Sequence, residues 1–156
     1  MSDLKEGDLA PAIEAKDENG ELVTLEEYRG KKVVLYFYPK DNTPGCTQEA
    51  CDFRDNLNRL TAKAQVIGIS PDSIQSHIKF KEKQSLNFPL LSDPDKKVLE
   101  NYGAFGEKKM YGKLLKGVIR STFVLDKEGI VLKKWSPVRV KGHVEKVLEF
   151  LASLDL

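Results

Sequence analysis

Runs of apolar residues divide the chain into short strands and amphipathic helices. Residues 33–38 read Val-Val-Leu-Tyr-Phe-Tyr without a polar break, which is typical of a central strand buried on both faces. Residues 66–69 predict a second buried strand, and 88–91 a shorter one. Residues 118–125 and 130–135 predict two antiparallel strands joined by a tight turn.

The N-terminal segment predicts a small β-hairpin. Ile13 and Ala15 precede an Asn-Gly pair at 19–20, and Val23 and Leu25 follow it. Asn-Gly between two short apolar runs is a strong local signal for a hairpin turn. We therefore expect a two-stranded unit ahead of the central strand.

Apolar residues spaced three and four apart predict the helices. The longest is expected from about Cys46 to Ala64, with a second at 73–84 behind the start signal Pro-Asp-Ser. A third should begin at Asp93-Pro94, and a last one should span 141–153. In the longest helix the apolar stripe includes Cys46, four residues before its next member, and continues through Ala50, Phe53, Leu57, Leu60 and Ala64.

Residues 103–117 are rich in glycine and lysine and are expected to form a loop. The remaining elements follow the order β-α-β-α, a further helix, then β-β-α. Helices alternating with buried strands favour a parallel sheet core, to which the late strands add antiparallel members. We predict an α/β fold of the thioredoxin-like kind, by analogy of element order. It would form one domain over residues 1–156, with a central mixed β-sheet flanked by helices.

Composition narrows the class of protein. The 156 residues are 40% hydrophobic and 31% charged, which is typical of a globular domain. The 25 basic and 24 acidic residues leave a net charge of +1, so neither nucleic acid nor an anionic membrane is expected as a partner. Because no signal peptide is recognisable, we expect a cytoplasmic protein, in which two cysteines are more often catalytic, redox-active or metal-binding than structural.

Residues 39–54 combine a strand end, a tight loop and a helix start. Cys46 is placed at the start of the helix, where free backbone N–H groups favour negative charge and therefore the nucleophilic thiolate. Cys51, the other cysteine of the chain, follows five residues later. A thiolate without metal or cofactor attacks disulfides or peroxides. Attack of Cys46 on a peroxide would give a sulfenic acid, which Cys51 could resolve as a disulfide.

The neighbours of Cys46 suit a small oxidant. The Thr43 hydroxyl can exchange hydrogen bonds with a peroxide. Pro44 lacks an N–H and shields one side of the loop, and Gly45 lets the backbone approach the substrate. Arg120 precedes an apolar strand segment, where its guanidinium could stabilise the thiolate and orient the peroxide.

The loop at 39–46 matches Pro-x-x-x-Thr-x-x-Cys and resembles the peroxiredoxin active-site motif. The second cysteine, within 49–54, resembles the bacterioferritin-comigratory or Q-type branch of that family. Similarity continues through 66–70, 91–93 and 120–123 to Gly142-His143, so it covers nearly the whole chain.

This resemblance implies a thiol peroxidase for hydrogen peroxide and organic hydroperoxides, with Cys46 peroxidatic and Cys51 resolving. Thr43 and Arg120 correspond to activating residues of the family. Pro39, Pro44, Gly45 and Glu49 are expected to line the peroxide site, with Glu49 holding the arginine. The resemblance also implies antioxidant defence, reduction by thioredoxin or a similar dithiol, a monomer, and no cofactor or metal.

Other interpretations of single residues stay open. The two cysteines could be ordinary semi-buried thiols, and Arg120 could pair with a surface carboxylate. Thr43 could serve only the turn. His77 and His143 are expected at the surface or at helix starts rather than as bases.

Two other functions compete with the peroxidase. A protein disulfide oxidoreductase favours Cys-x-x-Cys, whereas the spacing here is Cys-x-x-x-x-Cys. A zinc module would have to use Cys46, Cys51, His77 and His143, whose spacing matches no known finger.

Overall fold

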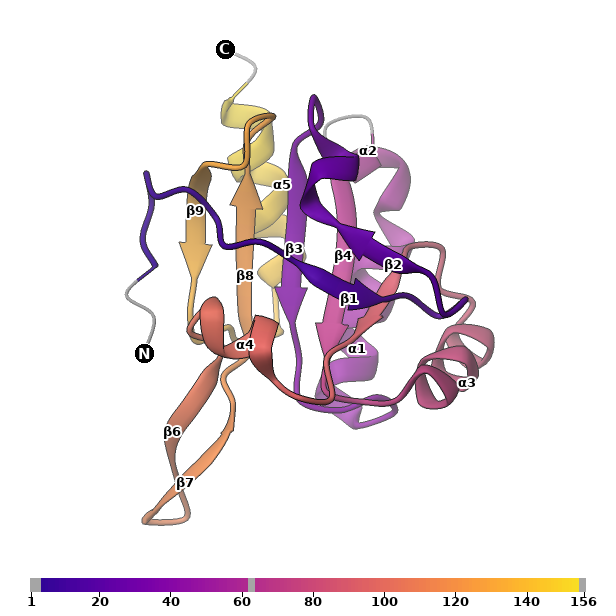
Figure 1. The fold of residues 1–156 in the computed structure, drawn as a ribbon, viewed down its shortest axis with the longest axis vertical. Coiled ribbons are helices and arrows are strands. Elements are labelled where there is room, and N and C mark those ends of the chain that lie inside the picture. Colours follow the sequence, from indigo (N-terminus) through magenta and orange to yellow (C-terminus); the bar gives the residue numbers. More distant parts are fainter. Residues whose placement is uncertain (1–3, 62–63, 155–156) are drawn as a thin grey trace.

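A seven-stranded mixed β-sheet organises the protein in the computed structural model, which describes residues 4–61 and 64–154 (Figure 1). Its strand order is β2-β1-β5-β4-β3-β8-β9. The three central strands are parallel and the outer pairings antiparallel, which confirms the predicted mixed sheet with an N-terminal hairpin. The strands are Glu14–Lys16 (β1), Leu22–Thr24 (β2), Val33–Phe37 (β3), Gln65–Ser70 (β4), Leu90–Ser92 (β5), Ser121–Leu125 (β8) and Val131–Trp135 (β9).

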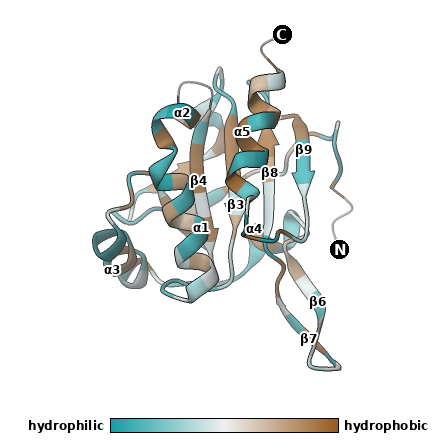
Figure 2. Cartoon of the chain, turned by 180° about the vertical axis from the view of Figure 1, so that it is seen from behind, coloured by the Kyte–Doolittle hydropathy of each residue, from teal (hydrophilic) through white to brown (hydrophobic). Residues whose placement is uncertain are grey.

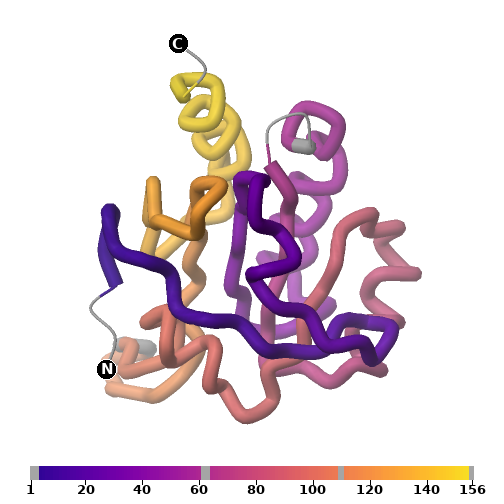
Figure 3. Tube along the Cα trace, turned by 45° about the horizontal axis from the view of Figure 1, so that its top comes forward, coloured from indigo at the N-terminus to yellow at the C-terminus, as the bar shows by residue number. Residues whose placement is uncertain are grey.

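Helices cover both faces of this sheet. Helices α1, α2 and α5 lie behind it in Figure 1 and face the viewer in Figure 2, whereas α4 lies on the opposite face with the N-terminal segment, whose path across the sheet Figure 3 traces. Alternate residues of β3 enter two separate cores, Val33 and Leu35 on one side and Val34 and Tyr36 on the other. The helices are Leu25–Tyr28 (η1, a 3-10 helix), Pro44–Asp55 (α1), Leu57–Thr61 (α2), Ile74–Gln84 (α3), Lys97–Asn101 (α4) and His143–Ser153 (α5).

The long helix expected from Cys46 to Ala64 is wrong in its extent. It begins two residues earlier, at Pro44, and is interrupted at Asn56. The Asn56 side chain donates to the carbonyl of Asp52 at 2.8 Å, and its own carbonyl accepts the N–H of Arg59 at 3.0 Å. Asparagine favours such local bonds over a continued helix. Residues 62–63 of the expected helix lie outside the described residues.

The loop expected at 103–117 is a β-hairpin, so that prediction is wrong. Strands Phe105–Met110 (β6) and Lys113–Val118 (β7) pair antiparallel and project from the body of the protein (Figure 1). Tyr111 and Gly112 turn the chain with φ values of 52° and 77°, as a two-residue hairpin turn with both central residues left-handed requires. Because these strands are rich in lysine and glycine, the sequence lacks the alternation of apolar and polar residues that would have predicted them.

Two boundaries also differ from the predictions. Helix α4 begins at Lys97, because the Asp93 carboxylate accepts the N–H of Leu99 at 2.8 Å and Lys96 adopts a left-handed φ of 62°. The strand expected at 118–125 breaks at Ile119 and Arg120, which separates β7 from β8. No helix in the described part of the chain is long and apolar enough to cross a membrane.

Candidate active site

Cys46 lies in the first turn of α1, at the carboxyl end of β3. Thr43 occupies the N-cap position in extended conformation, and Pro44 starts the helix, where its missing N–H is of no consequence. Only 1% of Cys46 is exposed, and its side chain belongs to the core beneath α1. Both cysteines are free thiols. The predicted place of Cys46, on the core side of a helix start, is confirmed.

Arg120 joins the sulfur of Cys46 to a buried carboxylate. Its Nη2 lies 3.2 Å from Cys46 Sγ and its Nη1 lies 2.6 Å from Glu49 Oε1. Burial lowers the pKa of Arg120, but the charges of Glu49 and Cys46 outweigh burial and leave that pKa raised. The interpretation of Arg120 as partner of a surface carboxylate is wrong, because Glu49 is completely buried.

Glu49 sits behind the guanidinium and away from solvent. Its second oxygen, Oε2, has no hydrogen-bond partner among the described residues. Burial raises the pKa of Glu49 to about 7, although Arg120 acts in the opposite direction. The guanidinium of Arg120 thus lies between this buried carboxyl and the sulfur of Cys46.

The loop before α1 and the first residues of that helix contain four more predicted residues. Thr43 Oγ1 donates to the carbonyl of Lys40 at 2.8 Å, so in this state it does serve the turn. A Cβ on Gly45 would lie 3.4 Å from Arg120 Nη2, at the border between tight and ordinary van der Waals contact. Gly45 therefore lies directly beside the guanidinium of Arg120. Pro39 is half-buried and Pro44 is exposed beside this loop.

Cys51 occupies a different environment on the same helix. It is half-buried, and its Sγ lies 3.5 Å from Gln84 Oε1 at the end of α3. Arg54, one turn further on, donates to the carbonyl of Gln84 at 2.5 Å. The two cysteines are thus held by different neighbours while α1 is intact. Nothing in the spacing of the sequence pointed to Gln84 or Arg54.

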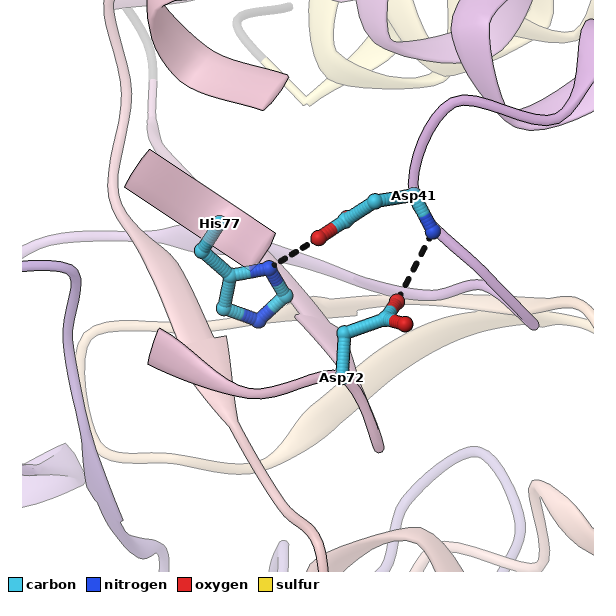
Figure 4. A group of neighbouring side chains, drawn as sticks. All are labelled: Asp41, Asp72 and His77. Carbon is cyan, nitrogen blue, oxygen red and sulfur yellow. Dashed lines mark hydrogen bonds and ion pairs between the residues drawn. The ribbon is translucent and has the colours of Figure 1, made fainter. Parts of the chain in front are cut away.

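The sequence predicts His77 and His143 at the surface or at helix starts. His143 is indeed the first residue of α5 and His77 lies in the first turn of α3, but both are buried, so a surface position is wrong for either. His77 is completely buried, and its Nδ1 lies 2.7 Å from Asp41 Oδ2. Figure 4 draws this pair together with Asp72. His143 is 3% exposed, and its Nε2 lies 2.8 Å from Thr122 Oγ1. Each imidazole forms a hydrogen bond with a polar side chain of another element. Such contacts between distant residues cannot be detected from the local sequence.

The zinc module is not assembled. In residues 4–61 and 64–154, the one group with metal-ligand spacing is Asp41, Asp72 and His77, which contains neither cysteine. Cys46 and His143 have other partners, described above.

His143 is expected to make the free energy of unfolding fall at acidic pH. Burial lowers its pKa to about 4, and the positive charges of Lys146 and Arg120 act in the same direction. As the pH falls, His143 is therefore protonated near pH 6.5 in the unfolded chain but only near pH 4 in the folded protein. The stabilising contribution is complete above pH 6.5 and is lost as the pH falls towards 4, by about 3 kcal/mol.

The measurement is urea unfolding of wild type and His143→Gln between pH 4 and 7, since glutamine can keep the bond to Thr122. The wild type should lose about 3 kcal/mol more than the variant over this range. Parallel pH profiles for the two proteins would contradict the assignment.

Comparisons with known proteins agree with this geometry. A family model described as the AhpC/TSA family matches residues 7–134. Peroxiredoxin Bcp of Bacillus subtilis is 50% identical over 150 residues, 96% of each chain. The Bcp of Escherichia coli is 42% identical over 97% of each chain. The solved bacterioferritin comigratory protein of Xanthomonas campestris, studied for alkyl peroxide reduction, has a TM-score of 0.86 at 41% identity over 90% of each chain. PrxQ of Xylella fastidiosa has a TM-score of 0.93 at 35% identity over 100% of each chain.

Proposed function

Because the chain belongs to the AhpC/TSA family, in its Bcp and PrxQ branch, we propose that Cys46 is its peroxidatic cysteine and Cys51 its resolving cysteine. The protein is a thiol-dependent peroxidase with the thioredoxin-like fold. The observation that carries the assignment is the 3.2 Å contact between Arg120 Nη2 and Cys46 Sγ at a helix N-terminus. A cation and unpaired N–H groups both favour the thiolate.

The proposed cycle uses only these two thiols and one external reductant. The Cys46 thiolate attacks the peroxide oxygen and breaks the O–O bond, which leaves a sulfenic acid, and the departing alkoxide or hydroxide takes up a proton. The Cys51 thiol then attacks the Cys46 sulfur, forming a disulfide and releasing water. A dithiol reduces that disulfide and is itself oxidised.

The remaining site residues have proposed roles in the first step. Arg120 orients the peroxide oxygens and Glu49 holds Arg120 from behind. Thr43 exchanges its hydrogen bond to Lys40 for one to the peroxide. Pro39, Pro44 and Gly45 line the approach. Hydrogen peroxide and organic hydroperoxides are the proposed substrates, supported by the alkyl peroxide reduction of the Xanthomonas relative.

The reductant, the oligomeric state and the cellular location are further parts of the proposal. We propose thioredoxin or a similar dithiol as reductant and antioxidant defence as the role. The presence of both cysteines in one helix supports a monomer, since no second chain is needed to form the disulfide. We also propose a cytoplasmic location. One sheet with strands from residues 14 to 135 supports a single domain over residues 1–156.

The disulfide is expected to require unwinding of α1. Five residues of an α-helix advance about 7.5 Å, which places the Cα atoms of Cys46 and Cys51 about 8.6 Å apart. A disulfide tolerates at most about 7 Å. We therefore expect the amides at 46–54 to be protected from hydrogen exchange in the reduced protein and to lose protection in the disulfide form.

Cys51→Ser is the matched control, because it should stop at the sulfenic acid with α1 still folded. In this variant peroxide oxidation should persist, sulfenic acid should accumulate, and recycling by thioredoxin should be impaired. Equal protection in both states of the wild type, with the intramolecular disulfide verified by mass spectrometry, would refute the unwinding.

A further inference from the structure

A buried polar cluster lies directly behind the loop that carries Thr43. Asp41 belongs to this loop, between β3 and α1, and its side chain is 1% exposed. His77 belongs to the first turn of α3, with a side chain that is 0% exposed. Figure 4 shows the imidazole pointing at the Asp41 carboxylate from the neighbouring element. The distance from His77 Nδ1 to Asp41 Oδ2 is 2.7 Å.

The partner of the other imidazole nitrogen shows where the hydrogens of the Asp41–His77 pair lie. His77 Nε2 lies 3.0 Å from the carbonyl of Leu91 in β5. A carbonyl only accepts, so Nε2 carries a hydrogen, and one further proton lies between Nδ1 and the carboxylate. The imidazole thus links the loop to α3 and to β5 at once.

Further donors complete the hold on Asp41. Tyr38 donates to Oδ1 at 2.6 Å and Ser76 donates to Oδ2 at 2.8 Å. The backbone N–H of Asp41 donates to Asp72 Oδ2 at 2.8 Å, and Ser70 donates to that same oxygen. The carboxylates of Asp41 and Asp72 therefore already accept hydrogen bonds from within the protein, which argues against a cation in this place.

One residue of the loop has a left-handed backbone conformation. Asn42, which follows Asp41 and precedes Thr43, has a φ of 63°. Asparagine adopts this region more readily than most non-glycine residues, and the contacts of Asp41 help to keep it there. A shift of this residue would move Thr43 and the first turn of α1 together.

We propose that the buried Asp41–His77 pair is the positioning device of the peroxide site, which holds residues 39–43 against α3 and β5 so that Thr43 faces a peroxide at Cys46. The inference rests on the proposed roles of Cys46 and Thr43. His77 is accordingly a positioning residue, since it acts through the loop and touches neither sulfur nor substrate.

Two near-isosteric substitutions separate the two bonds of the imidazole. The amide nitrogen of asparagine can replace Nδ1, so His77→Asn keeps the bond to Asp41 and loses that to Leu91. The amide nitrogen of glutamine can replace Nε2, so His77→Gln keeps the bond to Leu91 and loses that to Asp41. A role in general stability would make both variants equally defective, whereas positioning of the loop makes only His77→Gln strongly defective.

The experiment is performed in a Cys51→Ser background, where Cys46 is the single thiol. The rate constant for oxidation of Cys46 by hydrogen peroxide should fall by about 100-fold in His77→Gln and by less than about 5-fold in His77→Asn, since small displacements at a reacting centre have effects of this size. Alkylation of Cys46 by iodoacetamide, measured at a pH where the thiol is fully ionised, should change by less than about 3-fold in both, because it needs no positioned peroxide.

Equal losses in the two variants, or unchanged oxidation in His77→Gln, would overturn the proposal. A parallel fall of oxidation and alkylation would also overturn it, because the thiol rather than the peroxide would then be affected. Should His77→Gln fail to fold, Ser76→Ala removes a single donor to Asp41 and should lower oxidation by about 5-fold with alkylation unchanged. Peroxide turnover that survives in Cys46→Ser would instead refute the proposed function, which keeps the two failures apart.

Discussion

Cys46→Ser is expected to abolish peroxide consumption in an assay with thioredoxin and thioredoxin reductase. A serine hydroxyl at this position is a far weaker nucleophile towards an O–O bond than a thiolate, and Arg120 cannot ionise it near neutral pH. Cys51 is no substitute, because its sulfur contacts Gln84 and not Arg120. The expected residual rate is that of the assay without protein.

Two controls make this result specific. Cys51→Ser should still oxidise at Cys46 with a stoichiometric burst, although it should not turn over normally with thioredoxin. Insulin reduction should be slow in the wild type, which separates a peroxidase from a general disulfide oxidoreductase. Substantial peroxidase activity in Cys46→Ser would remove Cys46 from the proposed role.

Arg120→Lys is expected to lower the rate of Cys46 oxidation by about 100- to 1,000-fold, which is the effect of losing one well-placed donor to a developing charge. The wild-type guanidinium reaches Cys46 Sγ and Glu49 Oε1 with two different nitrogens. A lysine ammonium keeps the charge but cannot present this planar fork. Stopped-flow oxidation by hydrogen peroxide measures the loss directly.

The fold should persist in this variant, since lysine can still pair with the buried carboxylate of Glu49. The matched control is Arg139→Lys, at an exposed arginine of the same chain. Oxidation of Arg120→Lys at the wild-type rate would disprove a positioning role for the guanidinium. A loss shared by Arg139→Lys would show that the effect is not specific to the guanidinium of Arg120.

The sequence determined the parts of this protein that depend on local pattern. An unbroken apolar run is buried on both faces of the sheet as β3, because such a run has no polar side for solvent. Proline and glycine before Cys46 predicted a loop and a helix start, and α1 begins there. The match of residues 39–46 to the peroxiredoxin motif pointed to the right family, although the roles of single residues stay predictions.

Only the tertiary structure decided which distant residues meet. The resemblance implied that Glu49 holds Arg120, 71 residues away, but only the structure shows that this pair is buried beside Cys46. The pairing of Asp41 with His77, 36 residues apart behind the loop, had no signal in the sequence. The hairpin β6–β7 depends on cross-strand hydrogen bonds between lysine-rich strands. Pairings of this kind follow from the packing of whole elements. Histidine and glutamate are usually found at the surface, and when they are buried they need hydrogen-bond partners from other elements.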